Sequence, residues 1–318
     1  MHECCEHGIV HSQHTNEDFP SDKRIMKNRS RRAEITKETL EILEQGFYLN
    51  QGGCRVDFQS DLARANRLTI HYQPGDFENE GAIQPARPQD SREPVPATKT
   101  IIAVTRESTL EAAQRLVASE GQSWVLALNF ASAKNPGGGF LRGSQAQEES
   151  LARATGLYPC LIQKMRFYED HREQRCPIYS DSMIYSPDVP VLRDSNDTLL
   201  AEHYRLSILT CAAVNVGALK DNKKNKARVA HQHMLTRVEK ILTVAAENGH
   251  KSLILGAWGC GVFQNDPGTI AEYFHHHLLY NPRFQNSFEE ITFAILDRSP
   301  GCQTFQAFNR RFGSEAKI

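Results

Sequence analysis

The chain has 318 residues, a formal net charge of −1, 40% hydrophobic residues and 24% charged residues. This composition is that of an ordinary globular protein and excludes collagen-like and wholly disordered chains. The near balance of 37 basic and 38 acidic residues argues against a large basic face that grips nucleic acid regardless of sequence, so any anionic ligand must be held locally.

Membrane and export signals are missing from the sequence. No apolar run reaches the roughly 18 residues that span a bilayer, and MHECCEHGIVHSQH lacks the apolar core of a secretory signal. Eight cysteines are scattered without a CxxC pair, which is typical of reduced thiols. We expect an intracellular protein, cytoplasmic with a nuclear location also open, without disulfides and without a membrane partner.

Residues 1–30 are polar and predict a mobile tail. The Cys and His residues of this segment lack the spacing of a zinc finger or knuckle, so no metal site is expected; they are Cys4, Cys5, His7, His11 and His14. The basic cluster KRIMKNRSRR lies at residues 23–32. Short clusters of this kind are usually solvated; a nuclear-localisation signal and a contact with a polymer are the alternatives.

Residues 31–99 predict an N-terminal helical extension followed by a Pro-rich loop. Apolar residues recur on one helical face from Arg31 onward, and Gly46 supplies a stop. Residues 73–99 carry five prolines and little periodic apolar content, which indicates a long loop. Residues 100–318 form the main domain in this division.

Within the main domain, strand-like apolar runs alternate with helical patterns. The predicted strands lie at 100–104, 124–130, 183–186, 207–214, 252–257 and 291–297, and the predicted helices at 108–118, 147–167, 227–248 and 267–279. This alternation predicts an α/β fold in which helices cover a sheet.

Two of these strands end in glycine-rich loops that lead into helices. The first contains Gly137, Gly138 and Gly139, and the second runs from Gly256 to the Asp266-Pro267 helix start. Glycines let backbone N–H groups point at an anion, and α/β sheets bind ligands beyond the carboxyl ends of their strands. Two such loops can clamp one diphosphate. Neither matches a P-loop or GxGxxG, which argues against those nucleotide-binding classes.

Gln147, Glu148 and Glu149 open the helix after the first loop. Neighbouring helical side chains diverge by about 100°, so we expect unequal roles: one carboxylate fixes a sugar ring while the other acts as general acid and then base on a glycosidic bond. Gln147 could orient either. A helix start lowers the pKa of a glutamate, whereas a neighbouring carboxylate raises it. Acidic residues can also occupy a helix start merely to complement its dipole.

Cys260 lies in the second loop but does not fit a nucleophile elbow. The G-x-[SC]-x-G frame fails because Trp258 and Val262 occupy the glycine positions. We therefore expect no catalytic cysteine.

The spacing GGG-x7-QEE, preceded by NFASAKNP, resembles the signature of poly(ADP-ribose) glycohydrolases of the microbial and fungal macrodomain type. The segments RRAEITKETLEIL, MIYSPDVPVLRD, AAVNVGAL and LGAWGCGVFQNDP resemble the same family in the same order, from Arg31 to the C-terminus. The resemblance implies a three-layer α/β/α macrodomain-like mixed sheet with the N-terminal helical extension. Ser132 departs from the asparagine that the animal-type enzymes carry at this point.

The resemblance also implies residue roles. Glu149 would protonate the leaving oxygen and then activate water, Glu148 would hold the distal ribose, and Phe263 would pack against it. The substrate-binding candidates are Asn129, Gly137, Gly138, Gly139, Gln147, Gly259, Cys260, Gly261, Val262 and Phe263. No metal and no cofactor are expected.

These inferences predict hydrolysis of the ribose–ribose O-glycosidic bonds of poly(ADP-ribose). ADP-ribose would be released from chain termini, because no counterpart of the large accessory domain of the animal enzymes is visible. The expected partners are the polymer or an ADP-ribosylated macromolecule as substrate and ADP-ribose as product, without sequence-specific nucleic acid binding. Three alternatives stay open: hydrolysis of mono-ADP-ribosyl protein or DNA, a non-catalytic ADP-ribose-binding macrodomain, and a scaffold whose loops turn only for packing.

Overall fold

The computed structural model describes residues 22–78, 83, 85, 86, 99–220 and 222–313. The first 21 residues of the predicted tail, with the five candidate zinc ligands, and most of the predicted Pro-rich loop therefore lie outside the described residues. Helix α1 (Asp22–Gln45) begins earlier than the sequence pattern indicates, inside the predicted tail. It ends where predicted, at Gly46 with φ 77°.

Between α1 and the main domain lie elements that the sequence did not reveal. They are the hairpin of β1 (Phe47–Leu49) and β2 (Arg55–Asp57), helix α2 (Gln59–Leu68), strand β3 (Ile70–Tyr72) and the 3-10 turn η1 (Pro74–Phe77). The strands are only three residues long, too short to show an alternation that could be read from the sequence.

A seven-stranded mixed sheet forms the centre of the molecule, in the order β3-β6-β7-β5-β8-β9-β4. Its other strands are β4 (Ile101–Thr105), β5 (Val125–Phe130), β6 (Met183–Arg193), β7 (Leu199–Cys211), β8 (Ser252–Leu255) and β9 (Glu290–Ala294). The strands from β7 to β4 run parallel, whereas β3 and β6 are antiparallel to their neighbours. Strand β3 lies in the predicted N-terminal extension, residues 31–99, and pairs with β6 of the predicted main domain. The predicted boundary between these two parts at residue 99 stays a prediction.

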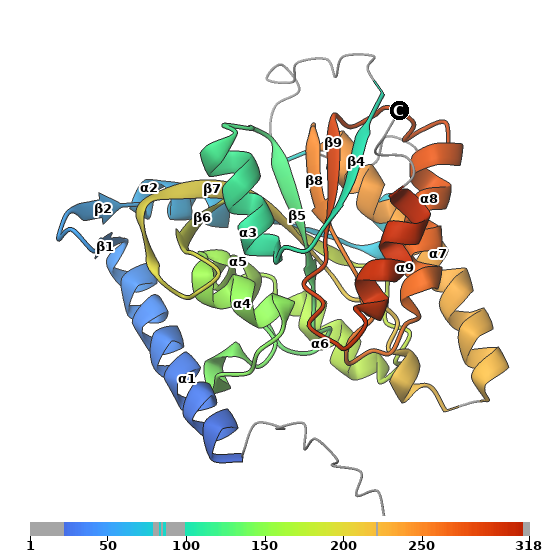
Figure 1. Cartoon of the computed structure of the whole chain (residues 1–318), viewed down its shortest axis with the longest axis horizontal. Helices are drawn as coiled ribbons and strands as arrows, with labels where there is room; N and C mark the ends of the chain where they lie inside the picture. Colours follow the sequence, from blue (N-terminus) through green and yellow to red (C-terminus); the bar gives the residue numbers. More distant parts are fainter. Residues whose placement is uncertain (1–21, 79–82, 84, 87–98, 221, 314–318) are drawn as a thin grey trace, which may run out of the picture.

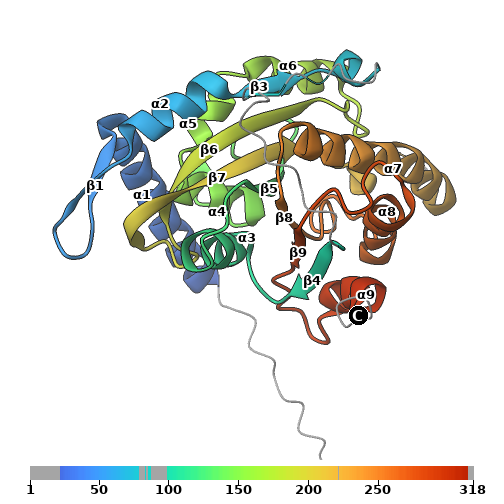
Figure 2. The same ribbon diagram turned by 90° about the horizontal axis from the view of Figure 1, so that it is seen from above.

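Helices cover both faces of the sheet, as Figures 1 and 2 show. One face carries α3 (Thr109–Ala113) with its π-helical continuation η3 (Gln114–Ser119), α4 (Gln147–Ala154), α5 (Leu157–Ile162) and α6 (Met165–Gln174). The other carries α7 (Lys223–Glu247), α8 (Pro267–Tyr280) and α9 (Gln303–Phe312). The predicted α/β fold with its N-terminal helix is confirmed.

Alternation along the strands explains the two cores. In β5, Leu126 and Leu128 join the core under α7 and α8, whereas Val125 and Ala127 join the core under α3, α4 and α5. Side chains of a strand point alternately to opposite faces, so a sheet buried on both sides reads as the continuous apolar run that predicted this strand.

The predicted helix at 147–167 is wrong in extent, because the chain breaks twice within it. Thr155 is extended (φ −136°, ψ 169°) and forms an isolated bridge with Val191 of β6. Gly156 N–H donates to the carbonyl of Pro190 at 2.9 Å. These contacts with a strand distant in sequence end α4, and Gln163 and Lys164 then separate α5 from α6.

Strands β6 and β7 are both longer than predicted. They extend as one antiparallel pair, with a register shift between Ser186 and Val189. Pro187 and Pro190 lie within β6 and hide its length, because proline inside a run argues against a strand. Helix α9 was also not foreseen.

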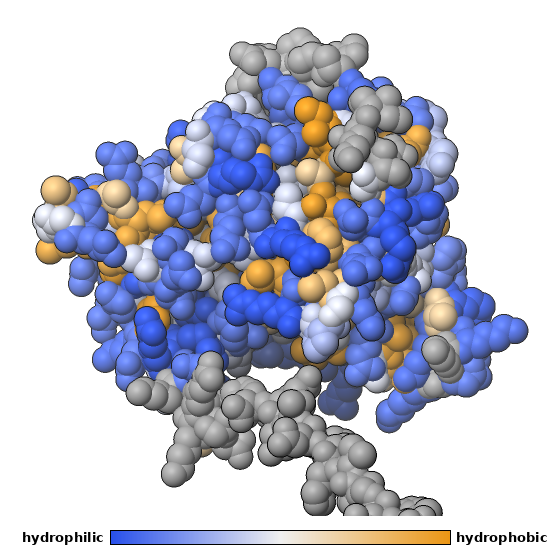
Figure 3. Space-filling view, viewed as in Figure 1, coloured by the Kyte–Doolittle hydropathy of each residue, from blue (hydrophilic) through white to orange (hydrophobic). Residues whose placement is uncertain are grey.

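The molecular surface is mostly hydrophilic on the face drawn in Figure 3, with a narrow, interrupted strip of apolar residues over the β8–β9 part of the sheet. Among the described residues, every helix is too short or too polar to cross a membrane.

Candidate functional site

The two glycine-rich loops meet beyond the carboxyl ends of two interior strands of the sheet. They follow β5 and β8, which are neighbouring parallel strands, so their carboxyl ends lie side by side. Both loops line a cavity of about 660 Å³. The predicted residues in its lining are Gly138, Gly139, Gln147, Glu148, Glu149, Gly259, Gly261, Val262 and Phe263.

Gln147 fixes the start of α4 against the sheet. Its Oε1 accepts a hydrogen bond from Phe130 N–H at 2.9 Å, and its Nε2 donates to the Leu128 carbonyl at 2.8 Å and to Thr109 Oγ1 at 3.0 Å. These bonds occupy the side-chain amide. Gln147 therefore positions the glutamates by holding their helix and not by bonding to either carboxylate.

Glu148 is buried, with 4% of its surface exposed. Its Oε2 accepts from Ser132 N–H at 2.7 Å, and Asn129 Nδ2 lies 3.5 Å from its Oε1 while also donating to Thr210 Oγ1 at 3.1 Å. Burial raises the pKa of Glu148 to about 8, and the charge of Glu149 adds to this increase, although the Ser132 N–H opposes it. Glu148 is therefore mainly protonated at neutral pH.

Gly138 brings the two carboxylates together. A Cβ on Gly138 would lie 2.5 Å from Glu149 Oε1 and 2.9 Å from Glu148 Oε2. The two side chains leave the helix in different directions, yet their carboxylates converge on this glycine, whose φ is 61°. Gly139 N–H donates to Glu149 Oε1 at 2.9 Å. The first loop therefore shapes the space around the carboxylates.

Two predicted binding residues lie beneath the cavity and do not line it. Asn129 is fully buried and contacts Glu148 from below. Gly137 has φ 69°, and a Cβ there would lie 2.8 Å from the ring of Phe140. Both support the residues that face the ligand space.

The second loop lines the cavity and contains backbone N–H groups that lack an acceptor within the described part of the chain. Asn265 fixes the loop by donating from Nδ2 to the carbonyls of Val214 (2.8 Å) and Gly259 (3.0 Å). The N–H groups of Gly261, Val262 and Phe263 find no acceptor among the residues that the structure describes. The Val262 side chain is 85% exposed. Successive unpaired N–H groups form a concavity suited to an anion.

Cys260 turns away from this cavity. It lines the adjoining cavity described below, and its Sγ lies 3.7 Å from the Trp258 carbonyl. Burial raises the pKa of the Cys260 thiol to about 12, so this cysteine is not an activated nucleophile.

Phe263 is supported by residues that sequence patterns did not reveal. Its ring packs against Tyr179, with 5.9 Å between ring centroids. The buried guanidinium of Arg237 donates to the Tyr179 carbonyl at 3.3 Å and to Asp181 Oδ1 at 2.8 Å. Tyr179 and Arg237 belong to no recognisable motif and lie far from Phe263 in sequence, so only the fold could identify them.

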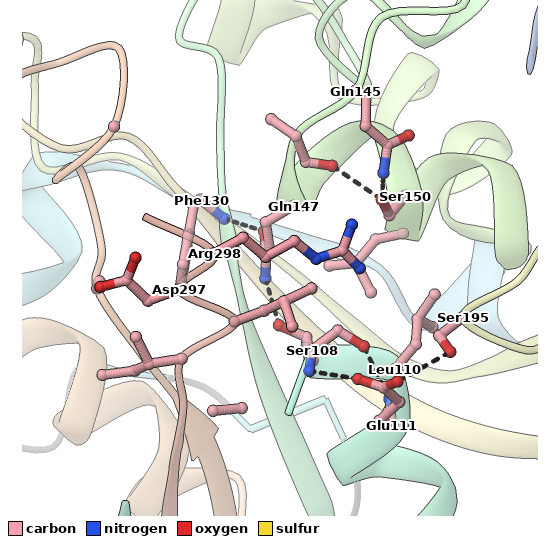
Figure 4. A pocket seen from close by; sticks show the side chains of 18 of the residues that line it. Ser108, Leu110, Glu111, Phe130, Gln145, Gln147, Ser150, Ser195, Asp297 and Arg298 are labelled. Atoms are coloured by element: carbon pink, nitrogen blue, oxygen red, sulfur yellow. Dashed lines mark hydrogen bonds between the residues drawn. The ribbon is translucent and has the colours of Figure 1, made fainter. Parts of the chain in front are cut away.

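A second cavity, of about 490 Å³, adjoins the first and shares with it Phe130, Gln147 and Gly261. Figure 4 shows its lining, with the Arg298 side chain extended over it. Ser108 and Glu111 form a capping box at the start of α3, with Glu111 Oε2 accepting from Ser108 N–H at 2.7 Å. Asp297 and Arg298 follow β9 and had not been predicted as site residues.

Comparisons with known proteins show similarity to one family. Residues 36–194 match the family model of the microbial-type PARG catalytic domain. The crystal structure of poly(ADP-ribose) glycohydrolase (PARG) from Thermomonospora curvata is 43% identical, with a TM-score of 0.80 over 89% of this chain and 100% of that chain. A structure of the Thermomonospora curvata protein bound to the inhibitor ADP-HPD gives 43% identity and a TM-score of 0.78 over the same shares.

The PARG from Deinococcus radiodurans in complex with ADP-ribose is 39% identical, with a TM-score of 0.69 over 80% of this chain and 97% of that chain. The curated proteins contain no match. The family model and the extent of these similarities lead to one conclusion: the chain belongs to the microbial-type poly(ADP-ribose) glycohydrolase catalytic-domain family, a family of glycosidases.

Proposed function

We propose that this protein hydrolyses the ribose–ribose O-glycosidic bonds of poly(ADP-ribose) and releases ADP-ribose, with Glu149 as general acid and base. The observation that carries the proposal is the convergence of two carboxylates on Gly138, in a cavity that also contains the free N–H groups of the second loop. Family membership supports the same activity.

The two cavities together suit one ADP-ribose unit. The diphosphate binds the N–H groups of Gly261, Val262 and Phe263, and the adenosine enters the adjoining cavity beside Arg298 (Figure 4). Gly261 lines both cavities, which suits a group that joins the two halves of the ligand. Because Gly139 N–H already bonds to Glu149, the second loop contributes more to anion binding than the first.

Glu148 and Glu149 have different roles in the proposed reaction. Glu148, neutral near pH 7, donates a hydrogen bond to a hydroxyl of the distal ribose and holds the ring. Glu149, less buried, acts in its protonated form when substrate is bound: it gives this proton to the leaving oxygen, and the resulting carboxylate then takes a proton from the attacking water. The diphosphate stabilises positive charge that develops on the ribose in the oxocarbenium-like transition state.

We also propose that the enzyme acts inside the cell and removes units from polymer ends. The thiols of Cys54, Cys160, Cys176, Cys211, Cys260 and Cys302 are free, as in reducing compartments. A cavity pair that holds one ADP-ribose unit favours a terminal unit, whose adenosine end carries no further chain.

The test is release of ADP-ribose from purified polymer, measured by chromatography. Glu149→Gln should lower the rate by about 100-fold or more while calorimetry still detects ADP-ribose binding. Glu173→Gln, at an exposed position of α6, is the matched control and should retain the wild-type rate. Equal rates for wild type and Glu149→Gln would contradict the proposal. Cleavage of mono-ADP-ribosyl protein or DNA, without cleavage of polymer, would indicate the alternative hydrolase activity.

A further inference from the structure

Helix α1 packs against the first glycine-rich loop, which leads to Glu148 and Glu149 and is called the catalytic loop from here on. Thr36 Oγ1 donates to the Phe140 carbonyl at 3.1 Å, Arg32 Nε to the Gly143 carbonyl at 2.8 Å, and Arg29 Nε to the Arg142 carbonyl at 2.9 Å. These carbonyls belong to the 3-10 turn η4 (Phe140–Arg142) and the residue after it. Figure 1 shows the N-terminal half of α1 beside the green segment that precedes α4.

Gly143 makes this close approach possible. Its φ is 70°, and a Cβ there would overlap the carbonyl oxygen of Arg29. The backbone of α1 therefore contacts the turn directly, and the position of Arg29 is fixed relative to Glu149, which follows the same turn.

Arg29 and Arg142 place two cations in the lining of the carboxylate cavity. Both residues are exposed, and neither has a carboxylate partner in the described part of the chain. The nearby Arg153 and Arg193 differ, since they pair with Asp197 at 3.1 Å and with Glu38 at 2.8 Å. The backbone bond of Arg29 uses only Nε, so its terminal N–H groups remain for a ligand.

The lining that the ADP-ribose unit does not use is open to the leaving group. The released ADP-ribose unit occupies the second loop and the adjoining cavity, so the leaving group extends toward the rest of the first cavity's lining, which includes Arg29, Leu141, Arg142 and Tyr158. In the polymer, the leaving ribose carries a further diphosphate. Guanidinium groups bind phosphate oxygens with two parallel hydrogen bonds.

We propose that Arg29 and Arg142 form a subsite for the diphosphate of the polymer unit that leaves, and so favour polymer over acceptors that carry no phosphate. This subsite rests on the proposed glycohydrolase function. The basic cluster of residues 23–32 then acts in substrate binding through Arg29, at the point where α1 meets the catalytic loop.

The experiment compares two substrates under steady-state conditions: purified polymer, and ADP-ribose joined at the anomeric carbon of its distal ribose to a phenolic dye without phosphate. Residue 142 contacts α1 through its backbone carbonyl, which accepts from Arg29. Arg142→Gln changes the side chain and keeps this carbonyl, so the helix stays docked. It should lower kcat/KM for polymer about threefold, mainly through KM, and the double variant with Arg29→Gln about tenfold.

The loss should be several times smaller on the dye substrate and should shrink as salt is raised. Arg142→Lys should restore part of the polymer activity, and Arg31→Gln, on an exposed position of α1 outside the cavity, is the matched control. Equal losses on both substrates, or no loss on polymer, would overturn the subsite while leaving the proposed function intact. A wild-type protein that cleaves neither substrate would overturn both.

Discussion

Gly138 lies so close to Glu149 that a Cβ on the glycine would come within 2.5 Å of the carboxylate oxygen Oε1. The same Cβ would lie 2.9 Å from Glu148 Oε2. The space that a side chain at residue 138 would fill is therefore occupied by the two carboxylates. Their positions depend on residue 138 being a glycine.

Gly138→Ala should consequently impair activity more than stability. The positive φ of 61° costs an alanine about 1–2 kcal/mol, and the overlap displaces both carboxylates. We expect ADP-ribose release to fall at least about tenfold, because small displacements of catalytic groups are costly. Gly121→Ala is the control, with φ 68° and nothing within 4 Å of the added Cβ. Equal losses of activity in the two variants would contradict this account.

The raised pKa of Glu148 should make stability depend on pH. Its folded-state pKa of about 8 exceeds the ordinary value of 4.5, so the native state binds the proton more tightly. This contribution is fully present below pH 4.5 and is lost as the pH rises to about 8. One such group changes the unfolding free energy by up to about 1.4 kcal/mol per pH unit.

Urea unfolding of wild type and Glu148→Gln between pH 6.5 and 8 would measure this effect. Burial also lowers the pKa of several histidines, which therefore release protons on folding and favour stability as the pH rises; they are His71, His171, His233 and His277. This contribution is the same in both proteins, so wild type should lose stability relative to the variant as the pH rises. A parallel pH dependence in both proteins would show that Glu148 is not the source.

Arg237 should be one of the most sensitive positions for stability. Its side chain is fully buried and bonds to Asp181 and to the carbonyls of Ile178 and Ala212 at 3.1 and 2.9 Å. Arg237→Met leaves Asp181 and these carbonyls under-satisfied and should cost about 3–5 kcal/mol. The exposed pair Arg55–Asp57 is the comparison, and Arg55→Met should change the free energy of unfolding far less, because exposed ion pairs contribute little. Similar values from denaturant titrations would contradict the prediction.

A pair of variants at Val262 tests the backbone donor of this residue. Val262→Pro deletes its N–H group, whereas Val262→Ala retains it and shortens a side chain that is 85% exposed. A hydrogen bond to a charged group contributes about 1.5–3 kcal/mol, so the proline variant should bind ADP-ribose at least about tenfold more weakly. Isothermal calorimetry on both variants checks this, and equal affinities would argue against the anion site in the second loop.

The sequence was informative where the functional residues are close together along the chain. The three glycines and the QEE run lie within 13 residues, Gly137 to Glu149, and helix and strand patterns on either side place them at a strand end. The second loop was found in the same way. Family resemblance extended this reading to roles for Glu148 and Glu149, which stay predictions.

Residues brought together from distant parts of the chain could not be found in this way. Tyr179 reaches Phe263, Arg29 reaches Arg142, and Arg298 reaches the cavity beside Gln147 only because of the strand order and the path of α1. The sequence also left open whether the helix dipole or the neighbouring carboxylate would dominate at the two glutamates, and for Glu148 neither does. Its burial, which raises the pKa, is a property of the folded state alone.

The sequence by itself determined the α/β alternation, the two glycine loops and the adjacent acids, because these follow from backbone preferences and short spacings. Only the tertiary structure decided that both carboxylates meet at Gly138, that the free N–H groups belong to the second loop, and that two arginines line the same cavity. The first two features depend on the backbone path of each loop in the folded state, and the third depends on a contact between segments far apart in sequence, Arg29 and Arg142 at a separation of 113. No local sequence pattern encodes them.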